Sequence, residues 1–177
     1  MALRRVRLYP DPVLRQRGAR VERFDDDLRR LVADMVETMH AAPGVGLAAP
    51  QVGESLRVAV VDVSVGADPD ALRVLINPEV LQVAGSQIES EGCLSIPGYT
   101  DKVERPAEVT IVASNLDGVP YELRGDGLLA RVVLHELDHL DGILFPDRLK
   151  GLRRERAKRV LKRMLRESEA AWAGEAR

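Results

Sequence analysis

The 177-residue sequence has one cysteine, few aromatic residues (3%) and no long run of apolar residues. A single cysteine cannot form an intramolecular disulfide, which is typical of proteins in a reducing compartment. No segment approaches the roughly 20 apolar residues of a membrane-spanning helix, and the N-terminal residues lack the apolar core of a signal peptide. The formal net charge of −2 says little about partners by itself. We expect a soluble, cytoplasmic protein with no membrane partner and no specific DNA target.

The length and the hydrophobic pattern predict a single domain over residues 1–177. Apolar residues recur every three or four positions in residues 25–40, after Gly125, and from about Leu152 to Trp172, which predicts three helices. Short strands are predicted at residues 56–63, 74–76, 80–83, 109–113 and 119–123. Asp117-Gly118 predicts a hairpin between the last two strands. This order predicts an α+β fold of mainly antiparallel sheets packed around a central helix, with a C-terminal helix.

The sequence His135-Glu136-Leu137-Asp138-His139 predicts a metal site on the central helix. Residues four positions apart lie on one face of a helix, so both imidazoles can bind one ion. Glu136 lies beside that face, where a carboxylate can act as a general base without being a ligand. The alternative is two histidines on a helix face, with charged neighbours that form salt bridges. The apolar spacing of the flanking residues favours the helix that the metal motif requires.

The third metal ligand is not obvious, although catalytic sites of this type usually have three protein ligands and one open position. Phe145 stands where one metalloprotease pattern has its third histidine, and residues 158–163 contain no acid that could serve instead. Cys93 is the remaining candidate, since a thiolate and two imidazoles suit a tetrahedral site. Two alternatives for Cys93 are an inert buried side chain and a nucleophile with His135 as its base.

Three segments of the sequence together resemble the peptide deformylases. They are Gly44–Gln51 (GVGLAAPQ), Glu91–Ser95 (EGCLS) and His135–Gly142 (HELDHLDG), in the family's order and at about its spacings. Residues Tyr9–Leu14 and Asn77-Pro78 extend the resemblance over nearly the whole chain. The resemblance implies hydrolysis of the formyl group from the N-terminal formylmethionine of nascent polypeptides, with release of formate.

The resemblance also implies the chemistry of the metal site. Cys93, His135 and His139 would hold one divalent metal, and Glu136 would be the general base. The metal would be ferrous iron in the cell, replaced by zinc or nickel in purified protein. A thiolate beside iron would be prone to oxidation.

Further residues gain roles from the same resemblance. The Gln51 side chain and the Leu94 backbone N–H would surround the developing oxyanion, although Gln51 could instead cap a turn. Arg105 resembles a family arginine that supports the site, with a structural salt bridge as the alternative. The residues that would line the substrate are Val45, Gly46 and Gly92 along the peptide backbone, and Leu128, Arg131 and Val132 around the methionine side chain.

Two positions depart from the family pattern. Leu134 stands where the family commonly has glutamine before the first histidine, and Pro43 stands where an acidic residue is common. Because Leu134 is not a ligand, we expect it to remove some supporting hydrogen bonds without abolishing activity. We expect Pro43 to alter the rim of the substrate cleft.

The C-terminal segment, residues 148–177, is predicted to be a basic helix. Between Arg148 and Arg166 ten residues are lysine or arginine, and only Glu155 is acidic. Such a charge run is usually a solvated helix face. In the deformylases the C-terminal helix is implicated in ribosome docking, and a basic helix gains from counterion release at ribosomal RNA. The candidates for ribosome contact are Arg153, Arg156 and Arg163.

Two other functions remain open at the level of sequence. The first is a metallopeptidase that cuts internal peptide bonds, against which Phe145 and the missing downstream acid both count. The second is a non-enzymatic, ribosome-associated protein with a structural zinc. A structural zinc site has four protein ligands, whereas only three candidates are evident here.

Overall fold

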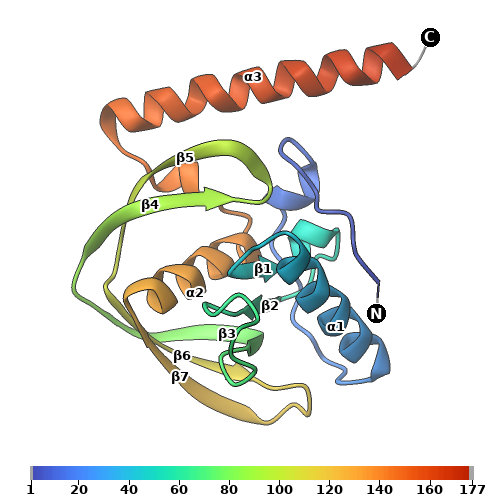
Figure 1. The fold of residues 1–177 in the computed structure, drawn as a ribbon, viewed down its shortest axis with the longest axis vertical. Coiled ribbons are helices and arrows are strands. Elements are labelled where there is room, and N and C mark those ends of the chain that lie inside the picture. The colour runs from blue at the N-terminus through green and yellow to red at the C-terminus, as the bar shows by residue number, and fades with distance from the viewer. Residues whose placement is uncertain (1, 176–177) are drawn as a thin grey trace.

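Helix α2 (Gly127–Leu140) lies between a five-stranded sheet and a two-stranded hairpin, as Figure 1 shows. The computed structural model describes residues 2–175. The larger sheet contains, in spatial order, β1 (Gly46–Ala48), β2 (Val58–Val61), β3 (Arg73–Ala84), β6 (Glu108–Ser114) and β7 (Pro120–Asp126). The hairpin contains β4 (Gln87–Cys93) and β5 (Ile96–Arg105). Neighbouring strands pair antiparallel throughout, so the predicted α+β fold around a central helix is confirmed.

Helix α1 (Asp26–Ala41) begins and ends within one residue of the helix predicted from the sequence. The side chain of Asp25 accepts a hydrogen bond from the backbone N–H of Leu28 at 3.2 Å, which caps the first turn. Asp26 and Asp27 place negative charge at the positive end of the helix dipole. The apolar face of α1 packs on β1 and β2, and its buried residues are Leu28, Leu31, Val32, Met35 and Met39.

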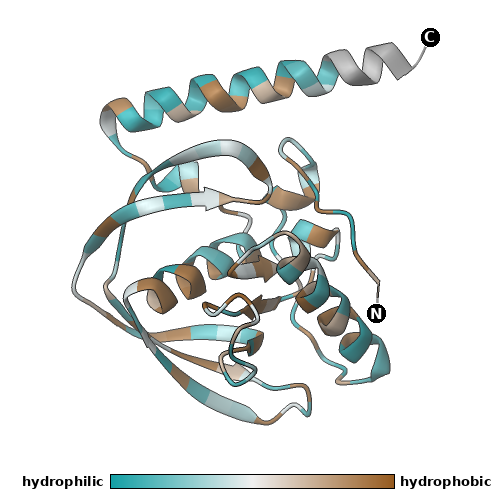
Figure 2. Cartoon of the chain, viewed as in Figure 1, coloured by the Kyte–Doolittle hydropathy of each residue, from teal (hydrophilic) through white to brown (hydrophobic). Residues whose placement is uncertain are grey.

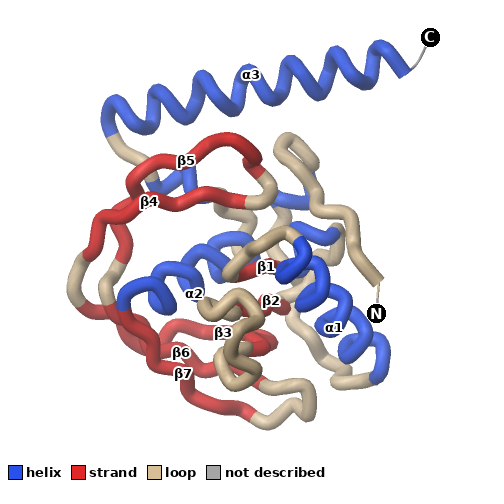
Figure 3. The backbone as a smooth tube through the Cα atoms, in the orientation of Figure 1, coloured by secondary structure: helices blue, strands red, loops and turns tan. Residues whose placement is uncertain are grey.

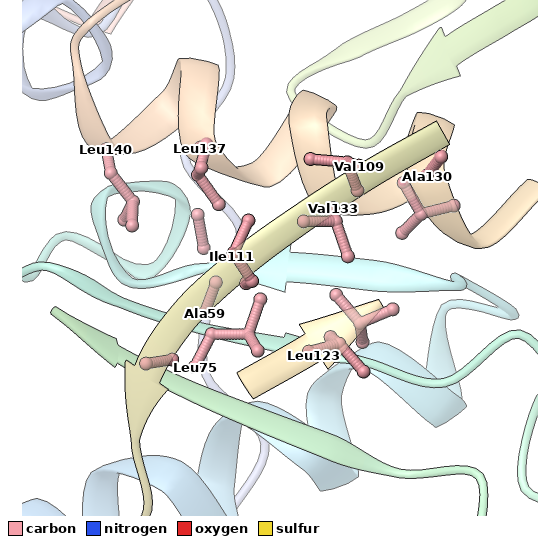
Figure 4. Close-up of a cluster of buried hydrophobic side chains, with 13 residues drawn as sticks. Ala59, Leu75, Val109, Ile111, Leu123, Ala130, Val133, Leu137 and Leu140 are labelled. Carbon is pink, nitrogen blue, oxygen red and sulfur yellow. The ribbon is translucent and has the colours of Figure 1, made fainter. Parts of the chain in front are cut away.

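One face of α2 forms the main core with the five-stranded sheet. In Figure 4 the helix residues Ala130, Val133, Leu137 and Leu140 face side chains of the strands, among them Ala59, Leu75, Val109, Ile111 and Leu123. Each buried valine, leucine or isoleucine side chain among them contributes roughly 1.5–3 kcal/mol relative to an exposed one. The helix is therefore anchored along its length, and its opposite face is available for polar residues.

Helix α3 (Gly151–Glu175) lies on the outer side of the β4–β5 hairpin (Figure 1). In Figure 2 its described turns are mostly hydrophilic, with hydrophobic residues at intervals. Four residues at helical spacing pack toward β5 and the preceding loop: Ala157, Val160, Leu161 and Met164. Among residues 2–175, no helix combines the length and apolarity needed to cross a membrane.

The strand boundaries differ from the sequence prediction in two places. Residues 74–76 and 80–83, predicted as separate strands, belong to the single strand β3, whose pairing with β6 shifts register between Ile76 and Glu79 and again between Val80 and Gln82. Asn77, at the first of these shifts, has a φ of +51° and exchanges hydrogen bonds of 2.8 and 2.9 Å with the backbone of Val21. Strands β1, β4 and β5 were not predicted, because their sequences are short or rich in polar residues and glycine.

Short 3₁₀ helices connect several elements. They are η1 (Pro12–Arg15), η2 (Ala49–Val52) and η3 (Phe145–Arg148). The tube in Figure 3 shows how loops join the helices and strands around α2. Helix η2 follows β1 directly and carries Gln51, while η3 links the end of α2 to α3. These connections place residues from distant parts of the sequence around one end of α2.

Candidate metal centre

Cys93, His135 and His139 lie together, with ligand atoms all within 4.8 Å of one another. The sulfur of Cys93 is 3.2 Å from Nε2 of His139, and the two imidazole centres are 5.0 Å apart. His139 is almost fully buried, with 1% of its surface exposed. Within the described residues this is the one group of three His, Cys, Asp or Glu side chains that could share an ion. The three predicted ligands are therefore brought together.

Local structure explains why these three side chains converge. His135 and His139 are one turn apart on α2, so their rings leave the helix on the same face. Cys93 is the last residue of β4, and it pairs with Ile96 after a shift in the hairpin register. This tight turn brings the end of β4 toward α2. The metal-binding arrangement thus requires a helix and a hairpin that are 42 residues apart in sequence, from Cys93 to His135.

The carboxylate of Glu91 orients His135. Its Oε2 is 3.0 Å from Nδ1 of His135, so the imidazole donates this hydrogen and its Nε2 remains available for a metal. Arg105 donates to both oxygens of Glu91, at 2.7 and 2.9 Å. Arg131 donates to Oε1 of the same carboxylate at 2.6 Å. Glu91 is therefore held rigidly between two guanidinium groups while it fixes the orientation of the imidazole.

Asp138 extends this buried network toward the C-terminal helix. Its Oδ2 accepts a hydrogen bond from Nη1 of Arg105 at 2.7 Å. Arg148, in η3, donates to both oxygens of Asp138, at 2.5 and 3.1 Å. The side chains of Arg105 and Asp138 are 4% and 8% exposed, so their charges are compensated inside the protein rather than by solvent.

The electrostatics of the site suit a bound cation. Burial alone would raise the pKa of Glu91, but hydrogen bonds from Arg105 and His135 outweigh it and lower this pKa to about 2. Burial alone would lower the pKa of His135, but Cys93 and Glu91 raise it to about 10. The side chains of Cys93 and Glu91, which favour the positive charge of a protonated His135, would also attract a cation beside it. Burial lowers the pKa of His139 well below its usual value, which keeps the ring neutral as ligation requires. One thiol and two imidazoles form a suitable donor set for a divalent metal.

Glu136 is a buried carboxylate beside the ligands. It is 3% exposed, and nothing within residues 2–175 hydrogen-bonds to its Oε2. Burial is the main cause that raises the pKa of Glu136 to about 7, with His135 opposing and Glu91 reinforcing the shift. Gly46 is the first residue of β1, and a Cβ atom on it would lie 2.3 Å from Oε1 of Glu136, so the close approach of β1 to this carboxylate requires glycine here. A carboxylate with a pKa near neutrality can exchange protons efficiently at physiological pH.

Gln51 reaches the same site from η2. Its Oε1 accepts a hydrogen bond from the backbone N–H of Ala48 at 2.9 Å. Its Nε2 is 3.2 Å from the hydroxyl of Ser95 and 3.5 Å from the sulfur of Cys93. The hydrogen bond from Ala48 is the turn cap that the sequence offered as an alternative for Gln51. The same hydrogen bond holds the side-chain amide so that its Nε2 points toward Cys93.

A cleft of about 220 Å³ opens beside the three ligands. All of the predicted substrate residues line it, namely Val45, Gly46, Gly92, Leu128, Arg131 and Val132, together with Gln51 and Leu94. Pro43 is also at its wall. A larger hollow of about 700 Å³ lies over β3, β6 and β7, but none of its lining residues is a histidine or cysteine. The smaller cleft is therefore the relevant one.

The remaining predicted residues lie outside the cleft. Arg105 does not line it and forms salt bridges with Glu91 and Asp138, while its predicted support of the reaction stays a prediction. Leu134, in α2, is half-buried and packs against the main core. The side chains of Arg153, Arg156 and Arg163 are exposed on α3. Arg153 lies 3.6 Å from the buried carboxylate of Asp101.

Three members of the polar network were not identified from the sequence. They are Glu91, Asp138 and Arg148. Glu91 and Asp138 belong to two of the three segments that resemble the deformylases, and that position could have identified them, but their hydrogen-bond partners come from other elements. Arg131 was predicted to border the methionine side chain of the substrate, and the structure adds that its guanidinium donates hydrogen bonds to Glu91 and to the carbonyl oxygen of Val103.

Comparison with known proteins identifies the family. The family model described as polypeptide deformylase matches residues 3–155. The chain belongs to this family. It is 48% identical over 169 residues to the peptide deformylase of Acidobacterium capsulatum, covering 96% of this chain and 99% of that protein.

Solved structures agree with this assignment. A peptide deformylase from Legionella pneumophila has a TM-score of 0.85 and 43% identity, over 95% of this chain and 98% of that one. The peptide deformylase of Thermus thermophilus has a TM-score of 0.85 and 40% identity, over 93% and 99% of the two chains. The chain is therefore a metal-dependent hydrolase with peptide deformylase activity, acting on formylated nascent peptides in N-terminal processing. Membership of this family favours deformylase activity over the two alternatives from the sequence, a peptidase that cuts internal bonds and a non-enzymatic zinc protein.

Proposed function

We propose that Cys93, His135 and His139 hold one divalent cation for hydrolysis of the N-formyl group from formylmethionyl peptides. The convergence of these three ligand atoms at the wall of a cleft carries this proposal. When bound, the cation supplies Lewis-acid polarisation and lowers the pKa of a water molecule toward neutrality. Ferrous iron is the proposed metal in the cell, with zinc or nickel replacing it in purified protein, since all three accept thiolate and imidazole donors.

Glu136 is the proposed general base. Its pKa of about 7 lets it take a proton from the attacking water and pass it to the leaving amine nitrogen. As the formyl carbon becomes tetrahedral, its oxygen gains negative charge. The side-chain N–H of Gln51 and the backbone N–H of Leu94 stabilise that charge, because both residues border the cleft beside Cys93.

The peptide backbone of the substrate docks along β1. This strand is at the edge of the five-stranded sheet, so one side of its backbone is free to pair with an added strand. Val45, Gly46 and Gly92 present backbone to the cleft, and the small residue at Gly46 allows close approach. The methionine side chain is received by Leu128, Val132 and the stem of Arg131.

The exposed arginines of α3 support a further proposal, that this helix contacts the ribosome. Arg153, Arg156 and Arg163 all face solvent on a helix that packs by one apolar stripe only. A basic face of this kind binds ribosomal RNA through counterion release. We also propose that residues 1–177 form one catalytic domain, that its basic C-terminal segment 148–177 acts through helix α3 (Gly151–Glu175), and that it works in the cytoplasm, where nascent chains emerge.

The direct test is formate release from a formyl-Met tripeptide by protein prepared without oxygen and loaded with iron. A Glu136→Gln variant keeps the size of the side chain and should lose activity by about 10²–10⁴-fold while retaining its metal. A Glu122→Gln variant is the matched control, because Glu122 is exposed on β7. Equal turnover by Glu136→Gln and the parent would refute the proposed role of Glu136. Absence of formate from a folded, metal-loaded parent would refute the proposed reaction itself.

A further inference from the structure

Asp62 is a buried carboxylate that the proposed chemistry does not use. It directly follows β2, and its side chain is 1% exposed. Oδ2 is 2.8 Å from Nε2 of His40 and accepts the backbone N–H of Gly66 at 2.8 Å. Oδ1 accepts the hydroxyl and the backbone N–H of Ser64, at 2.6 and 2.9 Å. Both oxygens are therefore fully engaged by neighbouring donors.

These donors keep Asp62 ionised. Burial alone would raise the pKa of Asp62, but the hydrogen bonds from Ser64, His40 and Gly66 outweigh it and lower the pKa to about 2. An ionised carboxylate can only accept hydrogen bonds, so Nε2 of His40 carries the hydrogen of this contact. The pair is thus a charge-assisted hydrogen bond between the last turn of α1 and the end of β2.

The backbone of Asp62 holds the wall of the cleft. Its N–H donates to the carbonyl oxygen of Val45 at 2.9 Å, which extends the pairing of Gly46 with Val61 by one residue. Val45 ends the loop that joins α1 to β1. In the same loop, the N–H of Gly44 donates to the carbonyl oxygen of Met39, in the last turn of α1, at 2.9 Å. The segment that joins α1 to β1 is consequently fixed from both sides.

His40 connects these two attachments. It lies at the end of α1, immediately before the segment 41–45, and its ring reaches across to the residue that binds Val45. Residues 43–46 all line the cleft. A change in the distance between α1 and β2 would therefore move the backbone that borders the substrate.

We propose that the His40–Asp62 pair positions the edge of β1 for binding of the substrate's peptide backbone. This inference rests on the proposed docking of the peptide along β1. His40 acts through Asp62 and Val45 and touches neither substrate nor metal, so it is a positioning residue. Its loss should weaken binding of longer peptides, which pair with more of β1, and should spare a substrate with no residue after the methionine.

The experiment compares formyl-Met-Ala-Ser with formylmethionine amide for the parent and its variants. His40→Phe removes the donor and should lower kcat/KM for the tripeptide by about tenfold, mainly through KM, because small misplacements of binding groups are costly. The same variant should change kcat/KM for the amide by less than about twofold. His40→Gln should recover most of the loss, because its side-chain N–H can donate to Asp62.

Ser64→Ala is the matched control. It removes a hydrogen bond from the same carboxylate but leaves the contact between His40 and Asp62 intact. It should lower the thermal unfolding temperature without changing the preference for the longer peptide. His40 is 32% exposed, which favours tolerance of substitution. Should His40→Phe fail to fold, His40→Asn gives the same comparison, because its shorter amide falls short of Asp62.

The possible results distinguish failure of the His40–Asp62 proposal from failure of the proposed peptide docking along β1, on which it rests. A parent that turns over the amide as well as the tripeptide would show that the peptide does not dock along β1. A parent that prefers the tripeptide, together with folded His40 variants that keep the full preference, would overturn the positioning role alone. Equal losses on both substrates would also overturn it, because they would indicate general destabilisation of the site.

Discussion

Oε2 of Glu91 accepts the Nδ1 hydrogen of His135 at 3.0 Å, across a sequence separation of 44 residues. This contact leaves Nε2 of the imidazole directed toward His139 and Cys93, the other members of the cluster. Glu91 itself is fixed by Arg105 and Arg131. The orientation of a proposed metal ligand is thus set by a hairpin residue rather than by the helix that carries it.

Replacing Glu91 with glutamine should weaken metal binding by about 10–100-fold, since groups that orient a ligand are typically worth that much. The variant should also be less stable by about 3–5 kcal/mol, because the buried guanidinium of Arg131 loses its anionic partner and that of Arg105 keeps only Asp138. Metal affinity is measured by competition with a chelator, and stability by urea denaturation.

Glu89→Gln is the control for the Glu91 variant, since Glu89 is exposed two residues earlier on the same strand. Its metal affinity should equal that of the parent. A Glu91→Gln protein that is folded and retains the parent's metal affinity would show that Glu91 does not support the ligand.

Replacing Gln51 with leucine should lower kcat by about 10²–10³-fold, as loss of one preorganised oxyanion donor typically does. KM should change less, because the donor acts mainly where charge develops. Metal content should persist, since Gln51 is not one of the three clustered ligands. The assay is formate release under saturating peptide, with Gln82→Leu on the exposed part of β3 as the control. A kcat within about twofold of the parent would contradict the oxyanion role.

Replacing Gly46 with alanine should nearly abolish turnover. The new Cβ would stand 2.3 Å from Oε1 of Glu136 and 2.8 Å from Val132, so either the general base or β1 must move. Gly18→Ala creates a comparable clash, at 2.9 Å from the backbone of Leu56, in a segment that does not line the cleft. Formate release per amount of folded protein should be much lower for Gly46→Ala than for the parent and should equal that of the parent for Gly18→Ala. Equal specific activities would count against the close approach at Gly46.

The sequence predicted the metal-binding helix and the ligands because their signals are local. His135 and His139 are four residues apart, and the apolar periodicity around them requires a helix. Helix α1 was predicted within one residue because its cap and its apolar face lie in the same short segment. The prediction of Cys93 as a ligand did not rest on a local pattern. It rested on elimination of other candidates and on resemblance to the deformylases.

The supporting contacts could not be predicted, because they depend on how distant elements pack. Glu91 is recognisable as part of the segment around Cys93, but nothing in the sequence says that it meets His135, Arg105 and Arg131 together. The β4–β5 hairpin that carries it was missed for a related reason. Its residues alternate weakly between apolar and polar, and its pairing is completed by the packing of β5 on η3 and α3.

The arginines of α3 give a prediction about ribosome contact. Changing Arg153, Arg156 and Arg163 together to glutamine should weaken co-sedimentation with ribosomes and reduce its dependence on salt, because fewer counterions are released. Turnover of a free formyl peptide should be unchanged, since none of the three lines the cleft. A control changes Arg20, Arg23 and Arg30, which are exposed at the opposite end of the chain. Unaltered, salt-insensitive co-sedimentation of the α3 variant would contradict the proposal.

The carboxylate of Asp62 predicts a specific dependence of stability on pH. Its pKa is lowered from 3.8 to about 2 on folding, so the folded state favours the ionised form. This contribution to stability is complete above about pH 5 and disappears as the pH falls toward 2, because the unfolded chain binds the proton first. Asp62→Asn should therefore be less stable than the parent near neutrality, by about 1–3 kcal/mol for the loss of a charged acceptor.

The difference in the free energy of unfolding between the parent and Asp62→Asn isolates this effect. Other carboxylates, including Glu91, also titrate in acid, but they do so in both proteins and cancel in the difference. Urea denaturation at several pH values should show a gap that is constant above about pH 5 and shrinks steadily toward pH 2. A gap that stays constant over the whole range would mean that Asp62 does not hold its low pKa in the folded protein. The close donors Ser64, His40 and Gly66 would then not be engaged as a set, and the attachment of α1 to β2 would depend on packing alone.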